Sequence, residues 1–144
     1  IRDDLVTGVQ TCALPISRPN AYMDTTPFWR ATSEGRLLIQ YCVDSGEPQF
    51  FPRPISLVTG RRNLEWREAS GKGTVYSFTN TLNAWPGHEA RVPYLCALVD
   101  LEEGVRILCN LYQVKPEDVR IGMAVKLYWE RLTDELAYPA FVPA

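Results

Sequence analysis

Residues 94–114 read YLCALVDLEEGVRILCNLYQV, and the fold class follows from this stretch. It contains two runs rich in branched and aromatic residues, 94–101 and 105–114, a composition that is typical of β-strands. A short acidic connection separates the runs and ends in Gly104, which suits a turn position with positive φ because it has no Cβ. The stretch therefore predicts two strands joined by a tight connection.

Three further runs predict the rest of a barrel. Residues 73–81 and 124–132 alternate between apolar and polar positions, and 138–142 form a short last strand. Residues 116–119 begin with proline and acids, which favours one helical turn between the third and fourth strands. Five strands with this connection predict a mainly β fold with an OB-type barrel over residues 70–144. A generic β-sandwich is the structural alternative.

The segment before the barrel predicts a helix followed by a looped arm. In residues 18–35, Thr26 is a good N-cap, Pro27 suits the first helical position and Gly35 can end the helix. Residues 36–69 begin and end with strand-like runs. The middle of this arm is dense in proline, which excludes a helix or a central strand there.

Residues 1–17 read IRDDLVTGVQTCALPIS and have neither a helical nor a strand period. Residues 1–16 resemble the translation of a short-read sequencing adapter carrying an index. We therefore expect this segment to be non-native and to make few long-range contacts, so that Cys12 carries no meaning. The natural N-terminus is then expected to be missing.

The composition is that of a globular protein, with 46% hydrophobic and 22% charged residues among 144. A formal net charge of −2 argues against a general nucleic-acid binder, which normally presents a basic face. No apolar run approaches the roughly 20 residues of a membrane helix, and the acidic start is unlike a signal peptide. We therefore expect a cytoplasmic protein with no nucleic-acid or membrane partner.

Six segments occur in an order that resembles one family: FWRATSEGRLLIQYC, FPRPISLVTG, LEW, GKGTVYSFT, VPYLCALVDLEEGVRIL and IGMAVKLYWE. It is the family of zinc-ribbon plus OB-fold proteins, long known as a domain of unknown function, and the resemblance covers residues 27–143. Members are similar to small subunits that support thiolases, hydroxymethylglutaryl-CoA synthase-like enzymes, acyltransferases and steroid side-chain aldolases. The resemblance implies a non-catalytic accessory subunit that binds acyl-CoA beside a thiolase-like or aldolase partner in lipid, steroid or polyketide metabolism.

The resemblance also implies a rubredoxin-like zinc ribbon in the arm, but the ligand positions depart from the family pattern. Two CxxC pairs would fall at positions 42, 45, 56 and 59, which hold Cys42, Ser45, Ser56 and Thr59. Structural zinc takes four thiolate or imidazole ligands, and hydroxyls are poor substitutes. We therefore expect no metal and no other cofactor, and an arm held by packing. The apolar side chains available for that packing are Phe50, Phe51, Pro52, Pro54, Ile55, Leu57, Leu64 and Trp66.

The sequence contains no readable set of a nucleophile and a base. His88 is the only histidine and lies in a polar loop, while Ser77 and Thr79 have no base nearby in the sequence. Neither a nucleophile-elbow, a Walker nor a Rossmann motif occurs. This pattern favours an accessory role and leaves a residue donated to a partner's active site as an open alternative.

Coenzyme A brings phosphates, which favour arginine or lysine, and an adenine ring, which favours an aromatic wall. The candidates for acyl-CoA binding are Arg53, Arg61, Arg62, Lys72, Tyr76, Phe78, Trp85 and Tyr94. Solvated charges and core aromatics are the alternative interpretation of each of these residues.

Adjacent aromatic residues in the predicted helix indicate a partner surface. Phe28 and Trp29 cannot share one narrow helix face, and Phe50 and Phe51 lie beside Arg53 in the arm. Aromatic residues and arginine concentrate binding energy at interfaces, so we expect these four aromatic residues to contact the partner. Two rival functions remain: an OB-fold binder of single-stranded nucleic acid, in which bases stack on aromatic residues, and a scaffold protein unrelated to CoA.

Overall fold

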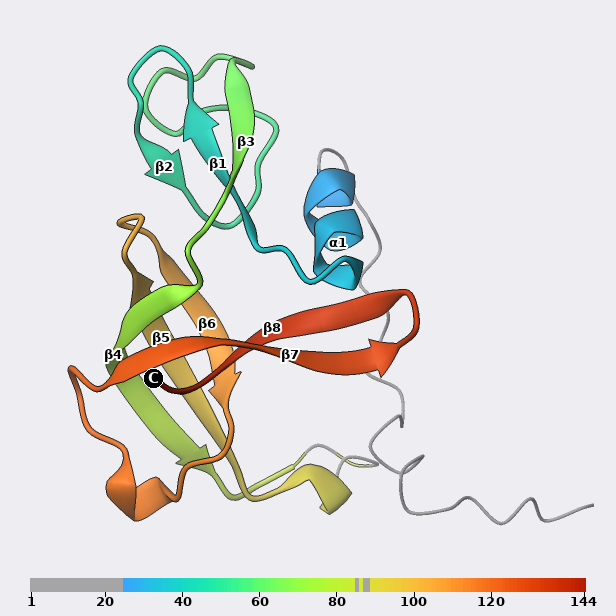
Figure 1. Cartoon of the computed structure of the whole chain (residues 1–144), viewed down its shortest axis with the longest axis vertical. Coiled ribbons are helices and arrows are strands. Elements are labelled where there is room, and N and C mark those ends of the chain that lie inside the picture. The colour runs from blue at the N-terminus through green and yellow to red at the C-terminus, as the bar shows by residue number, and fades with distance from the viewer. Residues whose placement is uncertain (1–24, 85, 87–88) are drawn as a thin grey trace, which may run out of the picture.

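The computed structural model describes residues 25–84, 86 and 89–144 (Figure 1). The expectations for residues 1–17 and for Trp85 and His88 lie outside the described residues. The rest of the chain forms a helix, a small sheet that makes up the arm, and a barrel. No helix within these ranges is long and apolar enough to cross a membrane.

The arm is a three-stranded sheet in the order β2-β1-β3. Strand β1 (Leu38–Cys42) pairs antiparallel with both β2 (Pro48–Gln49) and β3 (Leu64–Glu68). Strand β2 is two residues long and lies at an edge, which is where a proline-rich segment can still join a sheet.

Five strands close the barrel in the order β4-β5-β6-β8-β7, and two short 3-10 helices lie in its connections. All pairings are antiparallel except that of β6 with β8. This arrangement confirms the predicted mainly β fold with an OB-type barrel, and the sandwich alternative is wrong. The elements are β4 (Lys72–Thr81), η3 (Glu89–Arg91), β5 (Tyr94–Leu101), β6 (Arg106–Leu111), η4 (Pro116–Asp118), β7 (Ala124–Thr133) and β8 (Leu136–Pro143).

Two glycines and one glutamine set local features of the barrel. Gly104 has a φ of 82° between β5 and β6, as the turn prediction requires. A Cβ at Gly73 would lie 2.5 Å from the carbonyl oxygen of Asp100, so no larger residue fits where β4 pairs with β5. Gln113 has a φ of 57°, which ends the extended backbone soon after Leu111, earlier than the predicted run to residue 114.

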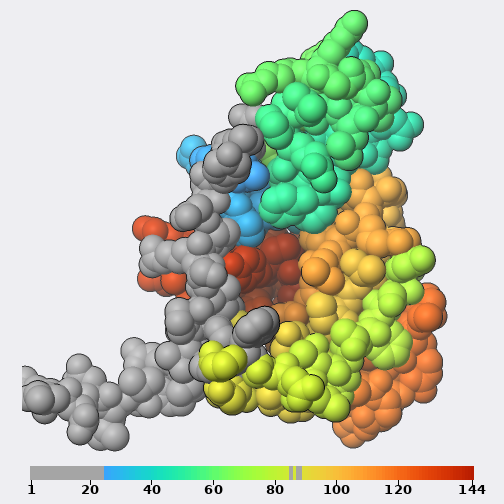
Figure 2. Space-filling model, turned by 180° about the vertical axis from the view of Figure 1, so that it is seen from behind, coloured from blue at the N-terminus to red at the C-terminus, as the bar shows by residue number. Residues whose placement is uncertain are grey.

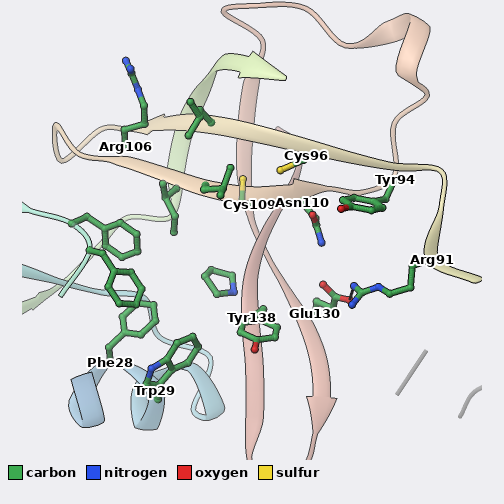
Figure 3. Close-up of a pocket in the computed structure, with 16 residues that line it drawn as sticks. Phe28, Trp29, Arg91, Tyr94, Cys96, Arg106, Cys109, Asn110, Glu130 and Tyr138 are labelled. Carbon is green, nitrogen blue, oxygen red and sulfur yellow. Dashed lines mark hydrogen bonds and ion pairs between the residues drawn. The ribbon is translucent and has the colours of Figure 1, made fainter. Parts of the chain in front are cut away.

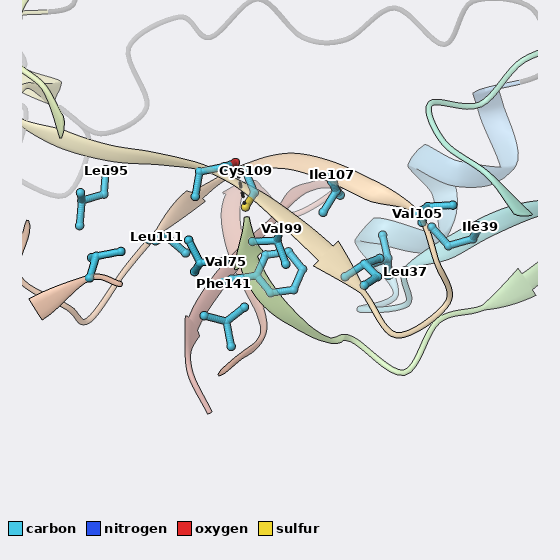
Figure 4. Close-up of a cluster of buried hydrophobic side chains, with 14 of the residues drawn as sticks. Leu37, Ile39, Val75, Leu95, Val99, Val105, Ile107, Cys109, Leu111 and Phe141 are labelled. Atoms are coloured by element: carbon cyan, nitrogen blue, oxygen red, sulfur yellow. Dashed lines mark hydrogen bonds between the residues drawn. The ribbon is translucent and has the colours of Figure 1, made fainter. Parts of the chain in front are cut away.

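The barrel core comes from alternating positions on each strand (Figure 4). In β5, every second residue from Leu95 to Leu101 is buried, and Val99 and Phe141 are 0% exposed at the centre. Leu37 and Ile39 continue the same core toward the arm. The arm and the barrel therefore share one continuous apolar interior.

Helix α1 (Thr26–Ser33) packs its buried face against this interior. Its N-cap is Thr25 rather than the predicted Thr26, with Pro27 in the first turn as expected. Phe28 is 1% exposed, so it is a core residue of this chain and not the exposed partner contact that we expected. Two adjacent side chains of a helix point in different directions. Phe28 is therefore buried in the core, whereas Trp29 is only partly buried.

The arm is held only in part as expected, since Phe50 and Trp66 do pack against the core. Ile55 and Leu57 are 42% and 61% exposed, so the prediction that they pack the arm is wrong. Two buried glutamines bind the loop backbone instead: Gln40 accepts a hydrogen bond from the Arg53 N–H at 2.8 Å, and Gln49 accepts one from the Leu57 N–H at 2.9 Å. The Gln49 amide also donates to Gln40 and to the Ile55 carbonyl. A proline-rich loop offers its backbone few partners of its own, and these side chains supply them.

Candidate functional site

A cavity of about 760 Å³ lies between α1, the arm and the barrel. Figure 2 shows the hollow from behind, with the arm above it, the β5–β6 side to one side and β8 at its floor. Cavities of roughly 300–1,000 Å³ are typical of ligand sites. This cavity is therefore the candidate functional site of the described residues.

The cavity follows from the way the barrel closes. Among the described residues, β6 and β8 pair only where Leu111 meets Phe141. Pro139, two residues before Phe141, has no N–H to extend that ladder. The earlier part of β6 and Pro139 instead line the cavity, and α1 covers the space between them.

Aromatic rings form one wall (Figure 3). The Phe28 ring lies 4.9 Å from the Trp29 ring edge to face and 5.8 Å from that of Phe50, while Trp29 lies 5.6 Å from Tyr138. Phe51 continues the wall and is 47% exposed. These rings come from the helix, the arm and β8. Trp29, Phe50, Phe51 and Tyr138 present apolar surface to a ligand, and Phe28 packs behind them.

A polar cluster lies at the other end of the cavity. Arg91 donates a hydrogen bond of 3.1 Å to Glu130, and the two side chains are 28% and 20% exposed. Tyr94 and Asn110 line the cavity beside this ion pair (Figure 3). Burial and a hydrogen bond with Glu130 raise the pKa of Tyr112, which lies outside the cavity lining, to about 12.

The same polar cluster separates the cavity from a second hollow of about 410 Å³. Arg91, Tyr94, Asn110 and Glu130 line both spaces. The second hollow is also lined by polar side chains, among them Asn80 and Gln113. The two spaces thus meet at one ion pair.

The other arginine of the cavity is already engaged. Arg106 binds Asp100 with two hydrogen bonds, of 2.6 and 3.0 Å, and its guanidinium lies 3.2 Å from the centre of the Tyr76 ring. The hydrogen bonds from Arg106 hold the pKa of the Asp100 carboxyl below its usual range. Both cations among the described lining residues therefore have carboxylate partners.

The two cysteines of the cavity are poor nucleophiles. Burial raises the pKa of Cys96, and burial with the nearby Cys96 raises the pKa of Cys109 to about 12. Thiols with raised pKa values stay protonated near neutral pH. The apolar wall and the polar cluster suit the cavity to binding an amphipathic molecule.

The predicted acyl-CoA residues do not meet in one place. Tyr94 lines the cavity and Tyr76 lies beneath Arg106, whereas Arg53 and Arg62 line a separate hollow of about 510 Å³ on the arm. Phe78 packs against the core, and Arg61 and Lys72 are exposed elsewhere. Of the predicted partner aromatics, all four line the cavity, namely Phe28, Trp29, Phe50 and Phe51.

Sequence reasoning missed the polar cluster. Arg91 and Glu130 are 39 residues apart, and no local pattern links them. One residue did offer a sequence signal for the cavity. Leu108 is apolar at an outward-facing position of β6, and it is 67% exposed at the cavity.

The four predicted zinc positions do converge in the arm. The Cys42 sulfur lies 3.8 Å from the Thr59 hydroxyl, and hydrogen bonds from Ser45, then Ser56, lower the pKa of Cys42 to about 6. The set offers one thiolate and three hydroxyls, which does not fit structural zinc. Among the described residues, no group of three His, Cys, Asp or Glu side chains is placed to hold a metal ion.

Comparison with known proteins identifies the family of this chain. Residues 66–130 match the family model described as the ChsH2 C-terminal OB-fold domain. A DUF35 domain-containing scaffold protein of Pyrococcus furiosus is 37% identical over 112 residues, which cover 78% of this chain and 82% of that protein. The chain belongs to the DUF35 family.

Two further comparisons concern a chain of a solved structure and a longer enzyme subunit. A chain of the solved "Ltp2-ChsH2(DUF35) aldolase" superposes with a TM-score of 0.78 at 35% identity, covering 88% of this chain and 98% of that one. The "Probable enoyl-CoA hydratase alpha subunit" of Thermomonospora curvata is 36% identical over 128 residues. The chain spans 40% of the length of that subunit.

Proposed function

We propose that this DUF35 chain is a non-catalytic accessory subunit that binds an acyl-CoA and supports a thiolase-, acyltransferase- or aldolase-type partner. One observation carries the proposal: the chain covers 98% of a DUF35 chain from an aldolase, at 35% identity and a TM-score of 0.78. The cavity supports it, because an apolar space with a polar end suits an acyl thioester better than a nucleic acid. Its thiols, with raised pKa values, support a binding role rather than a nucleophilic one.

The arm supplies a surface for that partner. Exposed large apolar side chains concentrate there, and Leu57 and Val58 are 61% and 62% exposed. Val43 and Ile55, also in the arm, are 51% and 42% exposed. Apolar side chains that gather on a surface mark interaction sites. The docking surface is thus the arm, with Trp29 and Phe51 at its border, while Phe28 acts from the interior.

Co-expression with a candidate thiolase- or aldolase-like partner enzyme tests the proposal. We expect one complex on size-exclusion chromatography, and carbon–carbon bond cleavage of an acyl-CoA only when both chains are present. Leu57→Asp with Val58→Asp should weaken complex formation at least about tenfold, because a charge buried at an apolar interface loses its solvation.

The matched control is Ile121→Asp, since Ile121 is 73% exposed on a barrel connection. This variant should form the complex like the parent chain. Equal complex formation by the arm variant and the control would contradict the arm as the docking surface. No complex with any such enzyme would contradict the accessory function itself.

A further inference from the structure

The aromatic cavity raises the question of which part of a CoA thioester it could hold. Such a ligand has three parts: a nucleotide with phosphates, an amide-bearing arm and an acyl group. Each part needs different protein groups, so the lining decides among them. Taking a CoA thioester as the ligand rests on the proposed function.

The nucleotide does not fit this lining. Phosphates bind where arginine, lysine or free backbone N–H groups are available. The cations among the described lining residues are Arg91 and Arg106, paired with Glu130 and Asp100. Binding a phosphate there would break an ion pair and bring the phosphate near a carboxylate.

The acyl group does fit. The wall of Phe28, Trp29, Phe50, Phe51 and Tyr138 is apolar. Leu108 adds to it from β6 and is 67% exposed, so it has contact surface to offer. Burying apolar area is favourable by about 25 cal/mol per Å², and a bound acyl group would remove both its own surface and the exposed part of this wall from water.

The polar end fixes the direction of the ligand. A thioester carbonyl and the amides that follow it need hydrogen-bond partners once they leave water. Tyr94, Asn110 and the Arg91–Glu130 pair offer donors and acceptors at the end of the aromatic wall (Figure 3). The second hollow continues beyond them with Asn80 and Gln113 in its lining.

We infer that the aromatic cavity binds the acyl group of the thioester, with the thioester at the Arg91–Glu130 pair and the nucleotide outside the cavity. This subunit therefore recognises the acyl group and not CoA itself. The partner enzyme, or solvent, surrounds the nucleotide.

Calorimetry with three ligands tests the inference on the isolated chain. The ligands are decanoyl-CoA, CoA without an acyl group, and decanoyl-N-acetylcysteamine, which has the acyl thioester and no nucleotide. We expect the two decanoyl thioesters to bind with Kd values within about threefold of one another, and CoA to bind at least about tenfold more weakly. Equal binding of CoA and decanoyl-CoA, binding of decanoyl-CoA alone, or no binding of either thioester would overturn the inference.

One pair of variants tests the location. Leu108→Asp places a charge in the cavity and should weaken decanoyl-N-acetylcysteamine binding at least about tenfold. Leu82→Asp is the matched control, because Leu82 is also 67% exposed and is not among the lining residues. Both side chains are exposed, so both variants should fold, and circular dichroism checks this. Unchanged binding by Leu108→Asp would place the acyl group elsewhere and overturn the inference.

The two proposals fail separately. Acyl thioester binding without any enzyme complex would contradict the accessory function and leave the acyl site standing. An enzyme complex whose DUF35 chain binds the thioester only through its nucleotide would contradict the acyl site and leave the accessory function standing.

Discussion

At the scale of single residues, the four positions predicted as zinc ligands gather around Cys42, and three of them carry hydroxyls. The Cys42 sulfur lies within contact of the Thr59 hydroxyl, and Ser45 and Ser56 donate to it strongly enough to lower its pKa to about 6. Ser56 is 1% exposed, and its hydroxyl also accepts hydrogen bonds from the Val58 and Thr59 N–H groups at 3.2 Å. Hydroxyls therefore take structural roles at positions where thiolates would bind zinc.

Restoring the thiols should restore zinc binding. We expect the Ser45→Cys, Ser56→Cys, Thr59→Cys variant to bind about one zinc per chain, because the four positions already converge. The parent chain should hold well under one zinc per chain by elemental analysis, since it offers a single thiol. The same triple variant with Cys42→Ala is the control and should bind zinc more weakly. Stoichiometric zinc in the parent chain that survives dialysis would contradict the metal-free arm.

At the scale of elements, glutamine side chains bind the loop backbone of the arm, in addition to the apolar packing of Ile39, Phe50 and Trp66. We expect Gln49→Ala to destabilise the arm by about 1–3 kcal/mol, because it leaves the part-buried Leu57 N–H and Ile55 carbonyl without their side-chain partner. Leu57→Ala should change stability by less than about 0.5 kcal/mol, since this side chain is 61% exposed.

Hydrogen exchange at the Ser56 amide is the measurement. This amide donates to the Arg61 carbonyl at 2.9 Å inside the arm, and neither substitution removes that acceptor. Faster exchange in Gln49→Ala than in Leu57→Ala is expected. The opposite order would show that the Leu57 side chain contributes more to the arm than Gln49 does.

At the scale of the whole molecule, Phe28 joins the helix, the arm and the cavity wall. Its ring lies 5.8 Å from Phe50 and 6.0 Å from Phe51, and the side chain is 1% exposed within the main core. We expect Phe28→Ala to lower the free energy of unfolding by about 3–5 kcal/mol, as is usual when a buried ring is removed. Chemical denaturation should show a lower midpoint with the same slope.

The comparison variant is Trp129→Phe, which keeps most of the side-chain volume. It removes one hydrogen bond of 3.1 Å to the Gly35 carbonyl, and a loss near 1 kcal/mol is expected. A Phe28→Ala variant as stable as the parent chain would return Phe28 to the surface role that the sequence suggested. A Phe28→Ala variant that is as stable as the parent chain but no longer binds the partner enzyme would also indicate a surface role for Phe28.

Local patterns are enough to predict the barrel, and long-range pairing alone creates the site. The alternation in residues 94–101 and 124–132 predicts strands because side chains of successive strand residues point to opposite faces, a property of a few neighbouring residues. The turn at Gly104 is predictable for the same reason, since positive φ is a property of one residue. The cavity depends instead on the single β6–β8 pair, Leu111 with Phe141, and on a helix that packs over the space beside it. The ion pair at its polar end joins residues 39 positions apart. Such contacts form only when the barrel closes, because they depend on which strands become neighbours and not on the character of any one strand.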